Sequence, residues 1–158
     1  LSGLSSDQVA PAYDAGRNLL YAYNSGSTVR AVNPSTGAIV STITLDLTAA
    51  GSPSIPYYVI GYEPTLDALI TYTTTGGARA LAFNPTTGAF VTSVSLPGTL
   101  PSPDSWRMGY ANHQLFIYDA AFDAYRGFAI TAIPEPGTIV LLALGIAMIG
   151  FAYRRRRL

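Results

Sequence analysis

The sequence predicts an all-β body followed by one C-terminal transmembrane helix. The body is rich in Tyr, Thr, Ser, Gly and Pro and poor in charged residues, which suits short strands joined by turns better than a helical bundle. Its apolar runs are short, β-branched or aromatic, and they end at turn-forming residues without helical periodicity. A continuous apolar run then occupies residues 139–153, directly before a cluster of arginines.

A repeat with a period near 50 residues runs through the body. Segments 33–45 and 84–96 are identical at seven of thirteen positions, at an offset of 51. Upstream of them, segment 13–23 matches 62–72 at an offset of 49. Short strands repeated at such a period predict the blades of a β-propeller, with strands running antiparallel within each blade.

A weaker third copy follows the first two. Residues 108–118 parallel 60–72 with two residues fewer in the turn, and 126–130 parallel 79–83. This copy has no candidate for a fourth strand, because the chain enters TAIPEP directly after Ile130. We therefore expect a partial β-propeller with up to four strands in each blade. The expected blades lie at about 8–47, 55–97 and 104–131, within a body of residues 1–131.

Equivalent positions in the three copies can be named in advance. Each copy should begin with a strand that ends at a tyrosine, and the second strand should carry a buried leucine. The equivalent residues are Tyr13, Tyr62 and Tyr110, and then Leu20, Leu69 and Leu115. Asp14 and Glu63 follow the first two tyrosines, which indicates a role within a turn rather than a catalytic carboxylate pair.

Two turns of sequence Asn-Pro-x-Thr-Gly, at 33–37 and 84–88, should join the third and fourth strands. The Asn side chain can accept hydrogen bonds from the backbone two residues on, and Pro presets φ at the second turn position. Gly can adopt the positive φ that a bulged hairpin requires. We interpret both turns as structural.

The segment YDAGRNLLYAYNSGSTVRAVNPSTGAIVSTITL, residues 13–45, resembles a YVTN-type β-propeller repeat, a relative of the quinoprotein-like and WD40-like propellers. The resemblance covers about residues 8–131, although LYAY replaces the usual Tyr-Val-x-Asn core and the later copies drift further. It implies a fold and no particular reaction. Because closed propellers have about four to eight blades, we expect this chain to be a fragment whose other blades lie upstream of Leu1.

The apolar tail predicts a short membrane span. From Thr138 to Tyr153 it holds 16 residues, which is about 24 Å as a helix against a hydrocarbon core of about 30 Å. Snorkelling arginines and local thinning of the bilayer can accommodate the difference. We expect one helix over about 138–155, separated from the body by a linker at 132–137. Four residues should keep the end of the 138–158 segment in the cytoplasm: Arg154, Arg155, Arg156 and Arg157.

The start of the tail carries Pro134, Glu135 and Pro136. This tripeptide, a short apolar span and a terminal arginine cluster together resemble the PEP-CTERM sorting signal of bacterial exported proteins, with Ile133 where Val is commonest. The resemblance implies recognition by exosortase, a membrane transpeptidase-like enzyme, removal of the tail near the motif, and a destination at the cell surface or outside the cell. It also implies a link to exopolysaccharide production, which makes an exopolysaccharide a candidate partner. An ordinary C-terminal anchor is the simpler alternative.

Composition excludes several classes of function. Residues 1–133 hold five arginines against seven aspartates and Glu63, a net charge of −3, so we expect no nucleic-acid partner. The absence of cysteine excludes disulfides, thiolate catalysis and cysteine-based zinc sites. No phosphate-binding loop, dinucleotide fingerprint or G-x-S-x-G elbow occurs, and we expect no cofactor.

The remaining candidates for chemistry are few. His113 is the single histidine; a Ser-His-Asp arrangement with Asp119 is conceivable, but a solvated turn residue is favoured. Asp119 and Asp123 suit a hairpin loop better than a calcium loop. Three aromatic residues, more often used in packing, could instead line a sugar-binding face: Tyr57, Tyr58 and Trp106. We therefore predict no catalytic residues, no metal site, and a binding or structural role. The alternative is a propeller enzyme, a lactonase or quinoprotein-like oxidoreductase, whose site lies in missing N-terminal blades.

Overall fold

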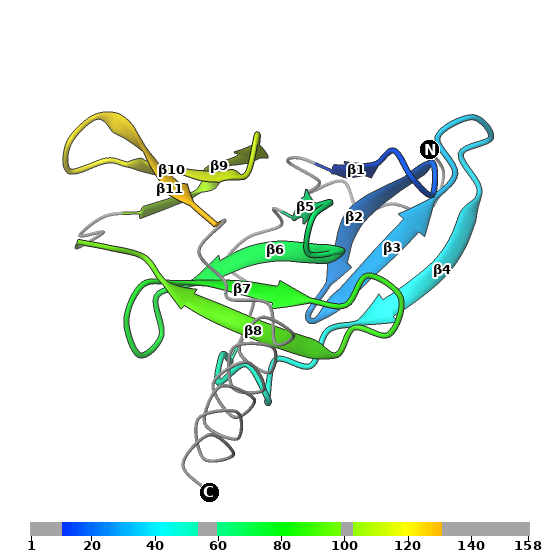
Figure 1. The fold of residues 1–158 in the computed structure, drawn as a ribbon, viewed down its shortest axis with the longest axis horizontal. Helices are drawn as coiled ribbons and strands as arrows, with labels where there is room; N and C mark the ends of the chain where they lie inside the picture. The colour runs from blue at the N-terminus through cyan, green and yellow to red at the C-terminus, as the bar shows by residue number, and fades with distance from the viewer. Residues whose placement is uncertain (1–10, 54–59, 99–102, 131–158) are drawn as a thin grey trace, which may run out of the picture.

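The computed structural model of the chain describes residues 11–53, 60–98 and 103–130 (Figure 1). Within these ranges the chain is all-β, and none of them contains a helix of the length and apolarity that crossing a membrane requires. The helix expected over 138–155 lies outside the described residues. The strands are β1 (Ala12–Asp14), β2 (Leu19–Ser25), β3 (Thr28–Val32), β4 (Ile39–Thr44), β5 (Gly61–Glu63), β6 (Ala68–Thr73), β7 (Arg79–Phe83), β8 (Phe90–Ser95), β9 (Pro103–Ala111), β10 (Gln114–Asp119) and β11 (Ala124–Ala129).

The strands form three antiparallel sheets that follow the chain. The first sheet has the order β1-β2-β3-β4, the second β5-β6-β7-β8, and the third, among the described residues, β11-β10-β9. Figure 1 shows the three sheets in succession, and β5 contacts both β1 and β9, so the first strands of the sheets lie together. The prediction of repeated antiparallel units of up to four strands is therefore confirmed.

The strand register confirms the equivalent positions. Tyr13 pairs with Leu20, Tyr62 with Leu69, and Tyr110 with Leu115. The predicted burial is wrong at one of the three leucines.

Leu69 and Leu115 are fully buried, whereas Leu20 is only half-buried. Leu69 packs against the first sheet and Leu115 against the second. Leu20 lies on the corresponding face of the first sheet, and no described sheet precedes it. The burial of this position therefore depends on the preceding sheet rather than on the residue itself.

The alignment of 126–130 with 79–83 is also wrong, by two residues. Phe83 pairs with Leu69, and Phe128 pairs with Leu115, so Phe128 is the residue equivalent to Phe83. A slip of two residues leaves the same side chains on the same face of a strand. The alternating pattern of the sequence therefore does not reveal such a slip.

The core lies between successive sheets. Alternate residues of β6 face opposite sides, with Leu69 against the first sheet and Ile70 against the third. All six residues of β6 are consequently buried. The Asn-Pro-x-Thr-Gly turns form as expected: Asn33 Oδ1 accepts hydrogen bonds from the N–H of Ser35 and Thr36, and Gly37 has a φ of 72°.

Candidate functional site

Three turns, each directly after a first strand, lie side by side and form what we call the inner-turn rim: residues 14–18, 63–67 and 111–114. In the first two turns a buried carboxylate organises the backbone. Asp14 Oδ1 accepts the N–H of Gly16 at 2.9 Å, and Glu63 Oε1 accepts the N–H of Thr65 at 2.8 Å. The turn role expected for these two acids is therefore confirmed.

Arg17 links the first sheet to the second. Its guanidinium binds Asp14 at 2.7 Å and reaches both carboxylate oxygens of Asp67 at 2.6 Å. The Tyr62 hydroxyl lies 3.2 Å from the same guanidinium and donates to Asp67 at 2.8 Å. A bidentate arginine–carboxylate pair fixes the relative orientation of the two groups as well as their distance. The Arg17–Asp67 pair therefore sets the orientation of the first turn relative to the second.

These contacts shift the acid–base properties of the cluster. Hydrogen bonds from Arg17 and Tyr62 hold the pKa of Asp67 below its ordinary value, although burial opposes them. Burial would raise the pKa of Asp14, but the hydrogen bonds and charge of Arg17 and the Gly16 N–H lower it. Burial and the hydrogen bond to Asp67 raise the pKa of Tyr62 to about 12. The cluster is thus ion-paired at neutral pH.

Glu63 links the second sheet to the third. Its Oε2 accepts the Tyr110 hydroxyl at 2.5 Å and lies 2.7 Å from His113 Nδ1. Burial would raise the pKa of Glu63, but the hydrogen bonds from Tyr110, the Thr65 N–H and His113 together lower it. Burial and the bond to Glu63 raise the pKa of Tyr110.

Sequence reasoning missed this link. His113 was expected to be a solvated turn residue; its side chain is 41% exposed, but its ring is held by the neighbouring sheet. The conceivable triad with Asp119 is wrong, because His113 precedes β10 and Asp119 ends it, so the strand separates them. Asp119 instead accepts the N–H of Ala121 at 3.1 Å in its own hairpin, as the hairpin interpretation predicts.

A short motif that recurs along the chain carries the missed signal. Three six-residue segments share a tyrosine, an acid directly after it, and Asn or Asp at the sixth position: 13–18, 62–67 and 118–123. In each, the tyrosine hydroxyl donates to the sixth residue. That residue has a positive φ, between 45° and 53° in the three copies. Asn and Asp tolerate this conformation better than other non-glycine side chains.

The third turn of the rim does not contain this motif. Asn112 and His113, both with positive φ, instead form a two-residue hairpin turn.

The equivalent tyrosines line a pocket of about 350 Å³ next to the rim. Its walls come from the first strands of all three sheets and from the residues just before them: Pro11, Ala12, Tyr13, Ile60, Gly61, Tyr62, Gly109 and Tyr110. A Cβ on Gly61 would stand 2.4 Å from the Tyr110 Cβ, so glycine allows the second and third sheets to approach here. Hydroxyls fixed by neighbouring turns hold the three rings in place, which lowers the entropy cost of binding a ligand.

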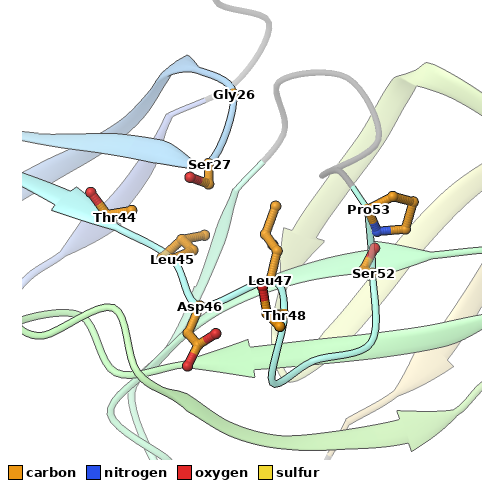
Figure 2. Close-up of a pocket in the computed structure, with 9 residues that line it drawn as sticks. All are labelled: Gly26, Ser27, Thr44, Leu45, Asp46, Leu47, Thr48, Ser52 and Pro53. Carbon is orange, nitrogen blue, oxygen red and sulfur yellow. The ribbon is translucent and has the colours of Figure 1, made fainter.

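A second, shallower pocket of about 710 Å³ lies at the C-terminal end of β4 (Figure 2). Figure 2 shows Ser27, Thr44 and Leu45 on one side and Leu47, Thr48 and Ser52 on the other, with Asp46 between them. Asp46 accepts the N–H of Ala49, and Ser52 donates to Thr73, so these polar groups already serve the loop. This pocket is therefore a weaker candidate for a binding site than the tyrosine-lined pocket.

Several predicted residues cannot be placed. Tyr57, Tyr58, the Pro134–Pro136 motif and the arginines 154–157 lie outside the described residues. Trp106 belongs to β9, and its side chain is outside the description. In the described part of the chain, no group of three or more His, Asp or Glu side chains is placed to hold a metal ion.

The fold and rim define an all-β protein built from repeated antiparallel sheets, with a tyrosine-lined pocket where the sheets meet. Residues 132–157 match the family described as the PEP-CTERM protein-sorting motif. This motif indicates an exported protein that carries a membrane-anchored sorting signal and is sorted by exosortase. Comparison with curated proteins found no match.

Proposed function

We propose that this chain is a bacterial envelope or extracellular-matrix protein that is tethered in the inner membrane and then released at its Pro-Glu-Pro motif by exosortase. The match of residues 132–157 to the sorting motif carries the proposal. The arginines 154–157 keep the C-terminus in the cytoplasm, because positive charges beside a span favour that side. The body then lies outside the inner membrane and reaches the cell surface or the medium.

The body is proposed to be part of a YVTN-type β-propeller. The position after each equivalent leucine faces the next sheet: Tyr21 packs toward the second sheet and Ile70 toward the third. The corresponding residue of the third sheet, Phe116, is only half-buried, as Leu20 is on the outer face of the first sheet. The face of the first sheet that carries Leu20 and the face of the third sheet that carries Phe116 correspond to faces that are buried between neighbouring sheets elsewhere in the structure. Further sheets of the same kind would cover both.

The molecular role we propose is non-enzymatic binding or structural support, with an exopolysaccharide as the partner. Aromatic rings suit the apolar faces of sugars, and the pocket volume of about 350 Å³ is enough for a small ring. The charged groups beside it are engaged with one another through Arg17 and Glu63. This favours an uncharged sugar unit over an ion.

An enzyme remains the second candidate, because His113 lies beside a buried carboxylate. A histidine oriented by a carboxylate is the arrangement of a general base. Such a propeller enzyme, a lactonase or a quinoprotein-like oxidoreductase, would carry further catalytic groups on other blades. Replacing His113 with Gln would abolish its activity. The binding role predicts no change in sugar affinity for that variant.

Two measurements test the proposal. Mass spectrometry of the mature surface protein should find a C-terminus near Pro134 in a host with exosortase; a peptide reaching Leu158 would mean a plain anchor. Binding of the released protein to purified exopolysaccharide should weaken with Tyr13→Ala. The control Tyr125→Ala changes a tyrosine of similar exposure, 59% against 53%, that lies outside the pocket. Equal loss in both variants would contradict the pocket as the binding site.

A further inference from the structure

We infer that exosortase meets the uncut protein at the inner-turn rim, so that the folded third sheet presents its His113 end to the enzyme. The inference rests on the proposed function, processing at the Pro-Glu-Pro motif, and adds the surface that the enzyme contacts. It follows from where the described part of the third sheet ends and how little chain separates that point from the motif.

Ile130 is a fixed point. It is 1% exposed, packs in the core between the second and third sheets, and donates its N–H to the His113 carbonyl at 3.0 Å. Three residues separate Ile130 from Pro134. Even fully extended, these four steps reach at most about 14 Å. While the third sheet is folded, the motif therefore stays close to His113.

The other end of the same sheet lies away from the motif. Strand β11 runs from Ala124 to Ala129, directly before Ile130. At about 3.3 Å per residue, Ala124 lies about 20 Å from Ile130 along the strand. An enzyme that acts on the motif consequently works beside the turn at 111–114, and the hairpin at 120–123 is the far end.

The chemistry of the rim favours a protein over a lipid surface. Asp14, Glu63 and Asp67 outnumber Arg17, and the lowered pKa values of the three acids keep them charged. Anionic lipid headgroups repel such a rim, since they attract basic segments. The hydrogen bonds within the rim already hold its side chains, so a protein partner would lose little affinity in ordering them.

Photocrosslinking tests the inference in the full chain, expressed with a catalytically inactive exosortase. A photoreactive phenylalanine analogue replaces either Ala111 at the near end or Ala124 at the far end; both are exposed strand residues of the third sheet. We expect several-fold more crosslinking to exosortase from position 111. Equal crosslinking from both positions, or crosslinking from position 111 to lipid alone, would overturn the inference.

A second readout comes from changing the length of the chain between Ile130 and Pro134 and measuring cleavage by active exosortase. Deleting residues 131–133 should leave export intact and block cleavage, because Pro134 would then follow the buried Ile130 directly. Inserting about ten Gly and Ser residues, a flexible coil, should preserve cleavage and abolish the preference for position 111. Normal cleavage of the deletion variant would refute the inference and leave the sorting proposal standing. A wild-type chain that is never cleaved would refute both.

Discussion

His113 Nδ1 lies 2.7 Å from Oε2 of Glu63, a carboxylate of the neighbouring sheet that is almost fully buried. The same oxygen accepts the Tyr110 hydroxyl, so one acid of the second sheet holds two side chains of the third. Asp14, its equivalent in the first sheet, instead holds Arg17, which reaches forward to Asp67. Asp14 and Glu63, the acids after the first two equivalent tyrosines, thus each organise their own turn and take part in the contact with the next sheet.

The Glu63→Gln substitution should destabilise the contact between the second and third sheets. Both carboxylate oxygens of Glu63 act as acceptors, Oε1 for the Thr65 N–H and Oε2 for the Tyr110 hydroxyl, so an amide in either orientation replaces one acceptor with an NH2 group. Removing a partner from a buried polar group costs about 1–3 kcal/mol. We expect urea-induced unfolding to show a loss of that size. Asp123→Asn is the control, because Asp123 is exposed and serves only its own hairpin, through Tyr118; its effect should stay within about 0.5 kcal/mol. Equal losses for the two variants would contradict this role of Glu63.

Stability should fall on acidification. The folded-state pKa values of Asp14, Asp67 and Glu63 lie below their ordinary values of 3.8 for Asp and 4.5 for Glu. A carboxylate with a lowered folded-state pKa stabilises the fold fully above its unfolded value, and this contribution disappears as the pH falls through the folded-state value. The urea midpoint should therefore be steady from neutral pH to about pH 5, and should decline from near pH 4.5 downwards.

The Glu63→Gln variant provides the control for that decline. It lacks one of the three titrating groups, so its midpoint should depend less steeply on pH below 4.5 than that of the wild type. A variant curve parallel to the wild type throughout this range would show that Glu63 does not contribute to the acid sensitivity.

The repeat made much of the fold predictable. Two segments identical at seven of thirteen positions indicated equivalent strands. The predicted equivalence of the three tyrosines, and of the three leucines, agrees with the register of the first hairpin in each sheet. Burial of Leu20 was not predictable, because it depends on a neighbouring sheet rather than on local pattern. The two-residue slip at Phe128 had a different cause: a shift of two residues leaves the alternation of buried and exposed positions unchanged.

The rim was less predictable than the strands. Turn roles for Asp14 and Glu63 followed from their position after a tyrosine, but the bonds from Glu63 to His113 and from Arg17 to Asp67 join residues 50 positions apart. No local sequence pattern predicts contacts between residues so far apart in the chain. A comparison of the turns themselves, with Asn or Asp five residues after the tyrosine, would have identified the hydroxyl partners of Tyr13 and Tyr62.

Gly61→Ala should loosen the approach of the third sheet to the second. The new methyl group would meet the Tyr110 Cβ at 2.4 Å, and overpacking of this kind costs about 1–3 kcal/mol. Gly109→Ala is the matched control, because a Cβ there meets nothing within 4 Å and the residue also lies in a first strand. Urea unfolding should separate the two variants. If Gly109→Ala destabilised the protein as much as Gly61→Ala, close approach at Gly61 would not be the cause.

The sorting motif and the arginine cluster should act on different steps. With Pro134→Ala and Glu135→Ala together, we expect an uncut protein held in the membrane, because the apolar run 139–153 is unchanged while the tripeptide that we propose exosortase recognises is lost. Replacing the arginines 154–157 with Gln should instead weaken orientation and retention, since these charges favour the cytoplasmic side. Membrane fractionation with mass spectrometry of the released protein distinguishes the outcomes. Normal release of the Pro134/Glu135 variant would show that the tripeptide does not direct cleavage, and the tail would then be an anchor processed by other means.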